Sequence, residues 1–289
     1  MTDQKTKDKN TRGNSRRDKT AHTAYKKLWT DVHPRNRECQ PKHGMAAELE
    51  ERRTPINVVC DDPVMITSDF HLPFIDFDLF KNMIKNAKEY KVDTLFISGD
   101  MWDCDNYTKF VRMTPTVNAF QEEIDSVKFH LKILMQNFDQ IYICRGNHEK
   151  RWIDMNAGRM GMKELFALAR PSNYSEDYWD EHVHITMDDH MYLEHNDQKW
   201  LFCHPKNFRI INLSVVKDLA AKYRCNVIGA HGHQMCQGWD RGGHYRIVDG
   251  GGLFDKCALE YLRDTNCYPE TRSGYYLLRD GKLISFEGK

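Results

Sequence analysis

The fold of this chain is decided by residues 141–149, which read IYICRGNHE. An apolar run of β-forming residues stops at Gly146, and the following turn presents Asn147, His148 and Glu149. This pattern predicts a buried strand whose carboxyl end opens into a loop. Because ligands bind at such strand ends in open α/β sheets, these polar side chains are candidate functional residues.

Four other stretches have the same form, an apolar β-type run followed by polar side chains. The runs are residues 64–68, 94–98, 200–203 and 225–230. The polar residues that follow them are, in chain order, Asp69, His71, Asp100, Asp103, His204, His231 and His233. Apolar residues recur at helical spacing over 79–87 and 120–137, between the first strands. The sequence therefore predicts βαβ units with a parallel sheet.

These strand ends carry the side chains of a metal site. A single histidine at a strand end is usually just hydrogen-bonded, but Asp69-x-His71 and His231-x-His233 place two donors on one side of an extended segment. With Asp100, Asn147 and His204 the set has no thiolate and suits Mn²⁺, Fe or Zn²⁺ better than Ca²⁺. Seven ligands with one shared carboxylate divide into two incomplete shells. Two ions about 3.5 to 4 Å apart clamp both the attacking and the leaving oxygen of a phosphoryl transfer.

In order and spacing, these motifs resemble the calcineurin-like metallophosphoesterase superfamily, over residues 64 to about 255. The motifs are Asp69-x-His71, Gly99-Asp100-x-x-Asp103, Gly146-Asn147-His148-Glu149, His204 and His231-x-His233. The resemblance implies an α/β fold of four layers (αββα), in which two mixed sheets are sandwiched between helices. It also implies a dinuclear site at the strand ends.

The resemblance further implies a role for each motif residue. Metal one would take Asp69, His71, Asp100 and His233, and metal two would take Asp100, Asn147, His204 and His231. His148 would protonate the leaving oxygen, and Asp103 would orient its imidazole by fixing the tautomer and raising the basicity. The implied cofactors are two divalent ions, Mn²⁺ first and Fe or Zn²⁺ next. The implied activity is hydrolysis of phosphate esters by a metal-bridging hydroxide.

One departure from the family pattern bears on the substrate. The run RGNHE at 145–149 matches the protein-phosphatase branch, but Cys104 stands where that branch places an arginine that grips the phosphate. A phosphomonoester dianion needs such cations more than a diester monoanion does. We therefore expect a phosphodiesterase or nuclease. The alternatives are a phosphomonoesterase such as a serine/threonine protein phosphatase-like enzyme, and a non-catalytic metal-binding scaffold. Arg145 and Arg151 are candidate phosphate contacts, or else surface or salt-bridged arginines.

The formal net charge of the 289 residues is zero, but the charge is unevenly distributed. Residues 1–43 carry twelve Lys and Arg against five Asp and Glu, a net charge of +7, which leaves −7 for the remainder. Two interpretations are open, a solvated flexible tail or an electrostatic arm for nucleic acid. We expect residues 1–54 to form this basic arm and residues 55–289 to form the metallophosphoesterase domain.

The sequence pattern loosens over residues 150–182, directly after the turn at Asn147. Met160 to Arg170 is helical in spacing, whereas Tyr174, Tyr178 and Trp179 lie in a polar stretch typical of a loop. An insertion at this place predicts a cap or a substrate wall, although loop aromatics also serve as packing anchors.

Several features indicate a cytoplasmic protein without a membrane partner. No apolar run approaches the ~18 residues of a membrane span, and the N-terminus lacks the apolar segment of a signal peptide. The nine cysteines form an odd set without a CxxC pair, and several lie in predicted buried strands. This usage is typical of a reducing compartment and disfavours a disulfide framework or a Cys-type zinc site.

Overall fold

The computed structural model describes residues 55–108, 120–259 and 271–288. These residues belong to one compact unit, which spans Glu50–Lys289. The basic arm predicted for residues 1–54 lies outside them. In the described part of the chain, no helix has the length and apolar content needed to cross a membrane.

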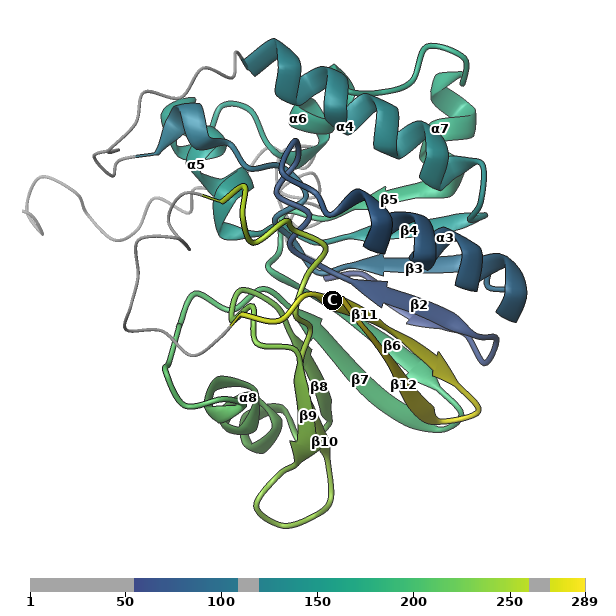
Figure 1. Ribbon diagram of the computed structural model, residues 1–289, viewed down its shortest axis with the longest axis vertical. Coiled ribbons are helices and arrows are strands. Elements are labelled where there is room, and N and C mark those ends of the chain that lie inside the picture. Colours follow the sequence, from purple (N-terminus) through teal and green to yellow (C-terminus); the bar gives the residue numbers. More distant parts are fainter. Residues whose placement is uncertain (1–54, 109–119, 260–270, 289) are drawn as a thin grey trace, which may run out of the picture. The chain divides into compact units, whose positions relative to one another are not determined.

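The first sheet has the strand order β12-β11-β2-β3-β4-β5 (Figure 1). Its strands are β2 (Val64–Thr67), β3 (Thr94–Ile97), β4 (Gln140–Ile143), β5 (Val183–Ile185), β11 (Gly274–Arg279) and β12 (Lys282–Glu287). Strands β2 to β5 are parallel, and β11 pairs antiparallel with both β2 and β12. The predicted parallel βαβ units are confirmed.

The second sheet has the strand order β1-β6-β7-β8-β10-β9. Its strands are β1 (Asn57–Val59), β6 (His190–His195), β7 (Gln198–Cys203), β8 (Asn226–Gly229), β9 (Cys236–Trp239) and β10 (Arg246–Asp249). Strands β6 and β7 form an antiparallel hairpin, and β7 pairs parallel with β8, with Phe202 opposite Ile228. Both sheets are therefore mixed.

The described helices cover the outer faces of the sheets. They are α3 (Phe77–Tyr90), α4 (Phe120–Met135), α5 (Asn147–Met155), α6 (Met162–Leu168), α7 (Glu176–His182), α8 (Ser214–Tyr223) and the short 3-10 helix η1 (Asp105–Tyr107). Helix α3 begins where the Asp76 carboxylate accepts a hydrogen bond from Leu79 N at 2.9 Å, which satisfies a free amide of the first turn. Figure 1 shows α3 and α4 along the first sheet and α8 beside the second.

Alternation along the strands creates separate cores between these layers. In β3, Leu95 and Ile97 belong to the core beneath α3 and α4, whereas Phe96 faces the second sheet. The Phe96 and Phe202 rings stack with centroids 4.6 Å apart, and burying each ring contributes roughly 1.5 to 3 kcal/mol. A third core lies between the second sheet and Val216 of α8. The predicted order of four layers, αββα, is confirmed.

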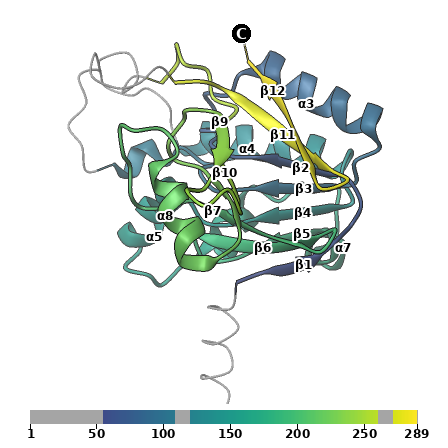
Figure 2. The same ribbon diagram turned by 90° about the horizontal axis from the view of Figure 1, so that it is seen from below.

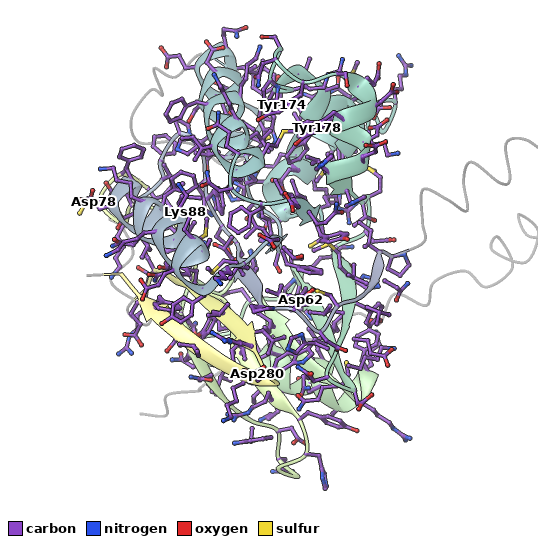
Figure 3. The ribbon with its side chains drawn as sticks, turned by 90° about the vertical axis from the view of Figure 1, so that its right-hand side faces the viewer. Asp62, Asp78, Lys88, Tyr174, Tyr178 and Asp280 are labelled. Carbon is purple, nitrogen blue, oxygen red and sulfur yellow. The ribbon has the colours of Figure 1, made fainter. Side chains whose placement is uncertain are left out.

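Residues 150–182 contain more helix than the sequence suggests. Helix α6 falls inside the predicted helical stretch, but the loop expected around Tyr178 is wrong, because α7 occupies 176–182. Ser175 caps α7 by accepting a hydrogen bond from Tyr178 N at 3.1 Å. Trp179 joins the core, and the Tyr174 and Tyr178 rings stack at 5.0 Å (Figure 3). A cap or substrate wall formed by this segment stays a prediction.

Candidate metal centre

The side chains predicted as metal ligands meet at the carboxyl ends of the strands, where the two sheets approach each other. Asp69 and His71 follow β2, Asp100 follows β3, Asn147 opens α5 after β4, His204 follows β7, and His231 and His233 follow β8. Figure 2 shows α5 and α8, which follow β4 and β7, on the same side of the strands. The least exposed of the set are Asp69, His71 and Asp100, at 0%, 0% and 1%.

The turns that carry these side chains have an unusual backbone. Left-handed φ angles occur at Asp69 (47°), His71 (47°), Asp100 (52°), His231 (71°) and His233 (54°). Each such residue costs on the order of 1 to 3 kcal/mol and persists only where its surroundings hold it in place. The loops hold one another, since Asp69 N donates to Gly99 O and His71 N donates to Asp100 O, both at 3.0 Å. Strain of this kind is typical of functional sites.

Asp69, His71 and His233 form the first ligand group. His71 Nδ1 lies 3.0 Å from the Asp103 carboxylate, so Nδ1 carries the proton and Nε2 keeps its lone pair. That Nε2 lies 3.3 Å from His233 Nε2, which is 3.0 Å from Asp69 Oδ1. Burial, and then the charge of His148, lower the pKa of His71. A neutral imidazole beside a carboxylate is the form that binds a metal.

Asp100, His204 and His231 form the second ligand group, beside Asn147. His204 Nδ1 donates to Ser98 O at 2.9 Å, and its Nε2 lies 2.7 Å from Asn147 Oδ1 and 3.2 Å from Asp100 Oδ2. Both oxygens are acceptors, so this point requires a cation. Burial lowers the pKa of His204, but the negative charge of Asp100 outweighs it and raises the pKa to about 10. A proton on Nε2 supplies the positive charge here, and a divalent cation could replace it.

Asp100 belongs to the second group and also faces the first. Its Oδ1 accepts a hydrogen bond from His148 N at 2.8 Å. Its Oδ2 is buried and accepts no hydrogen bond, although His204 Nε2 lies 3.2 Å away and His71 Nε2 4.0 Å away. A buried carboxylate without a compensating cation costs several kcal/mol. A protonated His204 or a divalent cation can supply that positive charge. The donor set thus fits two divalent cations that share Asp100.

His148 and Asp103 lie next to this carboxylate. His148 Nδ1 is 2.6 Å from the Asp103 backbone carbonyl and 3.2 Å from its side-chain Oδ1, and Nε2 is 3.8 Å from Asp100 Oδ2. The orienting contact therefore comes first from the main chain of Asp103, while its carboxylate is shared with His71. Burial lowers the pKa of His148, but the charge of Asp100 and the contacts with Asp103 outweigh this and raise it.

Glu149 is a functional residue to which the sequence analysis gave no role. Its fully buried carboxyl accepts hydrogen bonds from Asp100 N (3.1 Å), Gly146 N (2.9 Å) and Trp102 N (3.0 Å). It thereby ties the turn after β3 to the turn after β4. Burial and the charge of Asp100 raise the pKa of Glu149 to about 7. The sequence contained a signal for this role, because Glu149 stands three positions after Gly146, the spacing of a capping box at the start of a helix.

Gly146 shows how closely these two turns approach. A Cβ atom at this position would overlap Asp100 Oδ1 and lie 2.7 Å from Glu149 Oε2. Only glycine leaves room for the Asp100 carboxylate at this position, which explains why the apolar run of β4 stops here.

Asp249 supports the histidines of the second sheet in a similar way. Its buried carboxylate accepts hydrogen bonds from Gln234 N at 3.1 Å and Gly251 N at 3.2 Å, and a Cβ at Gly232 would overlap it. Burial raises the pKa of Asp249 to about 6. The sequence analysis missed this residue, although Asp249 follows an apolar strand and precedes three glycines, the same strand-end pattern as the predicted ligands.

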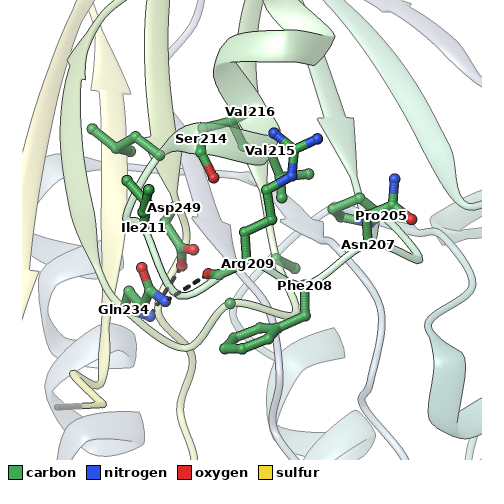
Figure 4. Close-up of a pocket in the computed structure, with 13 residues that line it drawn as sticks. Pro205, Asn207, Phe208, Arg209, Ile211, Ser214, Val215, Val216, Gln234 and Asp249 are labelled. Atoms are coloured by element: carbon green, nitrogen blue, oxygen red, sulfur yellow. Dashed lines mark hydrogen bonds between the residues drawn. The ribbon is translucent and has the colours of Figure 1, made fainter. Parts of the chain in front are cut away.

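The loop between His204 and α8 borders the site. Figure 4 shows a pocket behind this loop, lined by Arg209, Ser214 and Asp249 among others, with Gln234 Nε2 donating to Arg209 O at 3.5 Å. On the side toward the metal centre, the Phe208 ring lies 6.3 Å from the His231 ring. The loop therefore contributes an aromatic edge next to the second ligand group.

Comparison with known proteins agrees with this geometry. The sequence model of the calcineurin-like phosphoesterase family matches residues 62–237, which is more than half of the chain. The chain belongs to the calcineurin-like phosphoesterase family. No curated protein matches the chain.

Several solved structures share the fold at low sequence identity. Vacuolar protein sorting 29 from Cryptosporidium parvum is 12% identical, and the match covers 78% of this chain and 96% of that one, with a TM-score of 0.41. The phosphoesterase YfcE from E. coli is 12% identical over 76% of this chain and 90% of its own, with a TM-score of 0.38. Vps29 complexed with Zn²⁺ from Entamoeba histolytica is 11% identical over 78% and 98%, with a TM-score of 0.41. At these identities and TM-scores, no argument about function rests on the likeness.

Proposed function

We propose that this protein is a dinuclear metal-dependent phosphoesterase. The observation that carries the proposal is the buried Asp100 Oδ2, which accepts no hydrogen bond, belongs to the second ligand group and lies 4.0 Å from His71 Nε2 of the first. Family membership gives the reaction class, the hydrolysis of phosphate esters. The two ligand groups supply the place where cations would act.

The proposed ligands follow from the two groups and the bridge. Metal one takes Asp69, His71, Asp100 and His233, and metal two takes Asp100, Asn147, His204 and His231. Histidine nitrogens and hard oxygens without a thiolate favour Mn²⁺ as the working ion, with Fe and Zn²⁺ as alternatives. Bound cations stabilise the charge of the transferring phosphoryl group and activate the attacking water.

His148 is the proposed general acid. The Asp103 carbonyl holds Nδ1 at 2.6 Å, which leaves Nε2 as the atom that delivers a proton to the leaving oxygen. The position of Nε2, 3.8 Å from Asp100 Oδ2, keeps the acid beside the bridge. Asp103 is therefore the positioning partner of His148 and also of His71.

Two substrate classes are proposed, each on a different observation. Phosphodiesters, including nucleic acid, are favoured by Cys104, because its buried thiol has no positive charge with which to bind a phosphate dianion. Phosphomonoesters are favoured by Arg151, whose guanidinium lies 3.0 Å from His148 Nε2. The nucleic-acid partner also depends on the basic residues 1–43, outside the described structure. We expect a chain that begins at Glu48 to bind DNA and RNA more weakly, with a flatter salt dependence.

The test of the proposed function is an assay of the protein loaded with Mn²⁺, Fe²⁺ or Zn²⁺. Both p-nitrophenyl phosphate and bis-p-nitrophenyl phosphate serve as substrates, and the metal content is measured in the same samples. We expect two ions per chain, turnover of at least one ester, and loss of turnover on chelation. Two bound ions without any turnover would favour the scaffold over the enzyme. Full activity with one ion per chain would contradict the dinuclear site.

A further inference from the structure

Arg151 contacts His148 Nε2, the atom proposed to deliver the proton. It follows His148 by three residues on α5, so both side chains emerge on one face of the helix. Arg151 Nη2 lies 3.0 Å from His148 Nε2, and Nη1 donates to the Asp103 carbonyl at 3.4 Å. The guanidinium therefore stands at the edge of the metal centre.

The positive charge of Arg151 has no carboxylate partner within 4.0 Å among the residues that the structure describes. Arg209 and Arg170, in contrast, are each paired with a carboxylate, Arg209 with Asp218 at 2.6 Å and Arg170 with Glu176 at 3.3 Å. The contact of Arg151 with the carbonyl of Asp103 places the guanidinium beside Cys104, the next residue in the chain. An arginine without a carboxylate, at the edge of a phosphoesterase site, is available to an anion.

The described contacts of Arg151 leave most of its donors free for an anion. A guanidinium only donates hydrogen bonds, and its two described acceptors here, His148 Nε2 and Asp103 O, are both uncharged when they accept. A phosphate oxygen carries negative charge and is a stronger acceptor for a guanidinium than either of them.

We propose that Arg151 binds a non-bridging oxygen of the substrate phosphate and replaces the arginine that is absent at position 104. The inference rests on the proposed phosphoesterase function and adds phosphomonoesters as the substrate class that Arg151 would favour. A monoester dianion carries one more negative charge than a diester and has more free oxygens for the guanidinium fork. With Arg151 in this role, the site accepts phosphomonoesters in spite of Cys104.

The test compares Arg151→Ala and Arg151→Lys with Lys150→Ala, a matched loss of charge on the neighbouring residue of α5. Lys150 pairs with Asp154 at 2.6 Å. We measure kcat/KM for p-nitrophenyl phosphate and bis-p-nitrophenyl phosphate, and the affinity of the Mn²⁺-loaded protein for inorganic phosphate. The two esters share a leaving group that needs little protonation, so their difference reports the charge of the phosphate rather than the action of His148.

We expect Arg151→Ala to lower kcat/KM for the monoester roughly 10- to 100-fold, and that for the diester only a few-fold, with phosphate affinity reduced about 10-fold. Arg151→Lys keeps the charge without the fork and should give an intermediate loss. Lys150→Ala should change neither measurement, and all variants should retain the metal content of the wild type.

Equal losses on both esters with unchanged phosphate affinity would overturn the inference, because Arg151 would then act only through His148. A wild type that hydrolyses neither ester refutes the proposed function instead. In that case the affinities for inorganic phosphate still test the role of Arg151. Weaker phosphate binding by Arg151→Ala, but not by Lys150→Ala, would support a phosphate site at Arg151. Equal phosphate binding by all variants would overturn it.

Discussion

The two sheets contribute unequally to the metal centre. The first sheet supplies both carboxylates, Asp69 and Asp100, together with the general-acid candidate His148, whereas the second sheet supplies only histidines. Negative charge is thus concentrated on one side of the site. The pKa of His204 shows the consequence, because Asp100 across the site overcomes burial and raises it to about 10. Cations would therefore bind to charges on the first sheet and be completed by nitrogen ligands from the second.

Each sheet also has a buried carboxyl group that holds the turns of the site by hydrogen bonds. Glu149 ties together three main-chain amides from two turns of the first sheet, while Asp249 accepts from two amides beside the histidines of the second. Burial raises the pKa of both, to about 7 for Glu149 and about 6 for Asp249. The first sheet, which supplies the carboxylates, therefore also has more main-chain hydrogen bonds to its buried carboxyl group than the second sheet has.

The largest effect should come from removing the shared charge. Asp100→Asn keeps the shape of the side chain, but a neutral amide cannot hold two cations, so turnover should fall by about 10³-fold or more. Metal analysis of the same variant should find fewer than two ions per chain. An Asp100→Asn variant that keeps both ions and its activity would show that the charge on the first sheet is not essential.

The next largest effect concerns proton delivery from the first half. His148→Ala should keep both metals, because neither of the two proposed ligand sets contains His148, and should lose roughly 10² to 10⁴ in kcat. The loss should be greatest for esters with poor leaving groups, which need the proton. Turnover is measured across a series of aryl phosphates. A loss independent of the leaving group would assign His148 to binding or structure.

A smaller effect is expected from the two buried carboxyl groups, and it should differ between Glu149 and Asp249. Glu149→Gln leaves one acceptor oxygen for three amides, so we expect a loss of metal affinity or activity of about 10- to 100-fold. Asp249→Asn retains one acceptor for two amides and should lose less. Metal titration by calorimetry, with thermal unfolding as the control for stability, measures both. A larger loss in Asp249→Asn would reverse the comparison.

The smallest effect is on stability, and it isolates Glu123, which braces the turn after Asp103 in the first half. Its carboxyl accepts from Cys104 N at 2.6 Å, and burial raises its pKa from 4.5 to about 8. Between these values the folded state keeps a proton that the unfolded state has lost. The free energy of unfolding should therefore fall as pH rises, by at most about 1.4 kcal/mol per pH unit from this group.

Glu123→Gln keeps an acceptor for Cys104 N but cannot titrate, so its stability should fall less steeply over this pH range. Denaturant unfolding of metal-free wild type and variant at a series of pH values measures the difference between the two slopes. The difference removes the contributions of Glu149 and Asp249, which titrate in both proteins. Parallel slopes would show that Glu123 is ionised in the folded state.

Much of the site could be predicted from the strand ends. Alternation in β3 and the stop at Gly146 follow from local rules, and these rules placed Asp100 and Asn147 at the edge of a sheet. The loop expected around Tyr178 was wrong because packing of Trp179 into the core outweighs a polar local sequence. The support by Asp249 was missed because its partners, such as Gln234 N, come from another segment.

The sequence by itself determined which side chains stand at the strand ends, because local patterns of apolar and polar residues are enough to locate those ends. Only the tertiary structure decided which of these atoms face one another. The pairing of Asp100 with His204, and the approach of His71 to His233, depend on how the two sheets pack. These residues lie far apart in the chain, so no local pattern predicts their contacts.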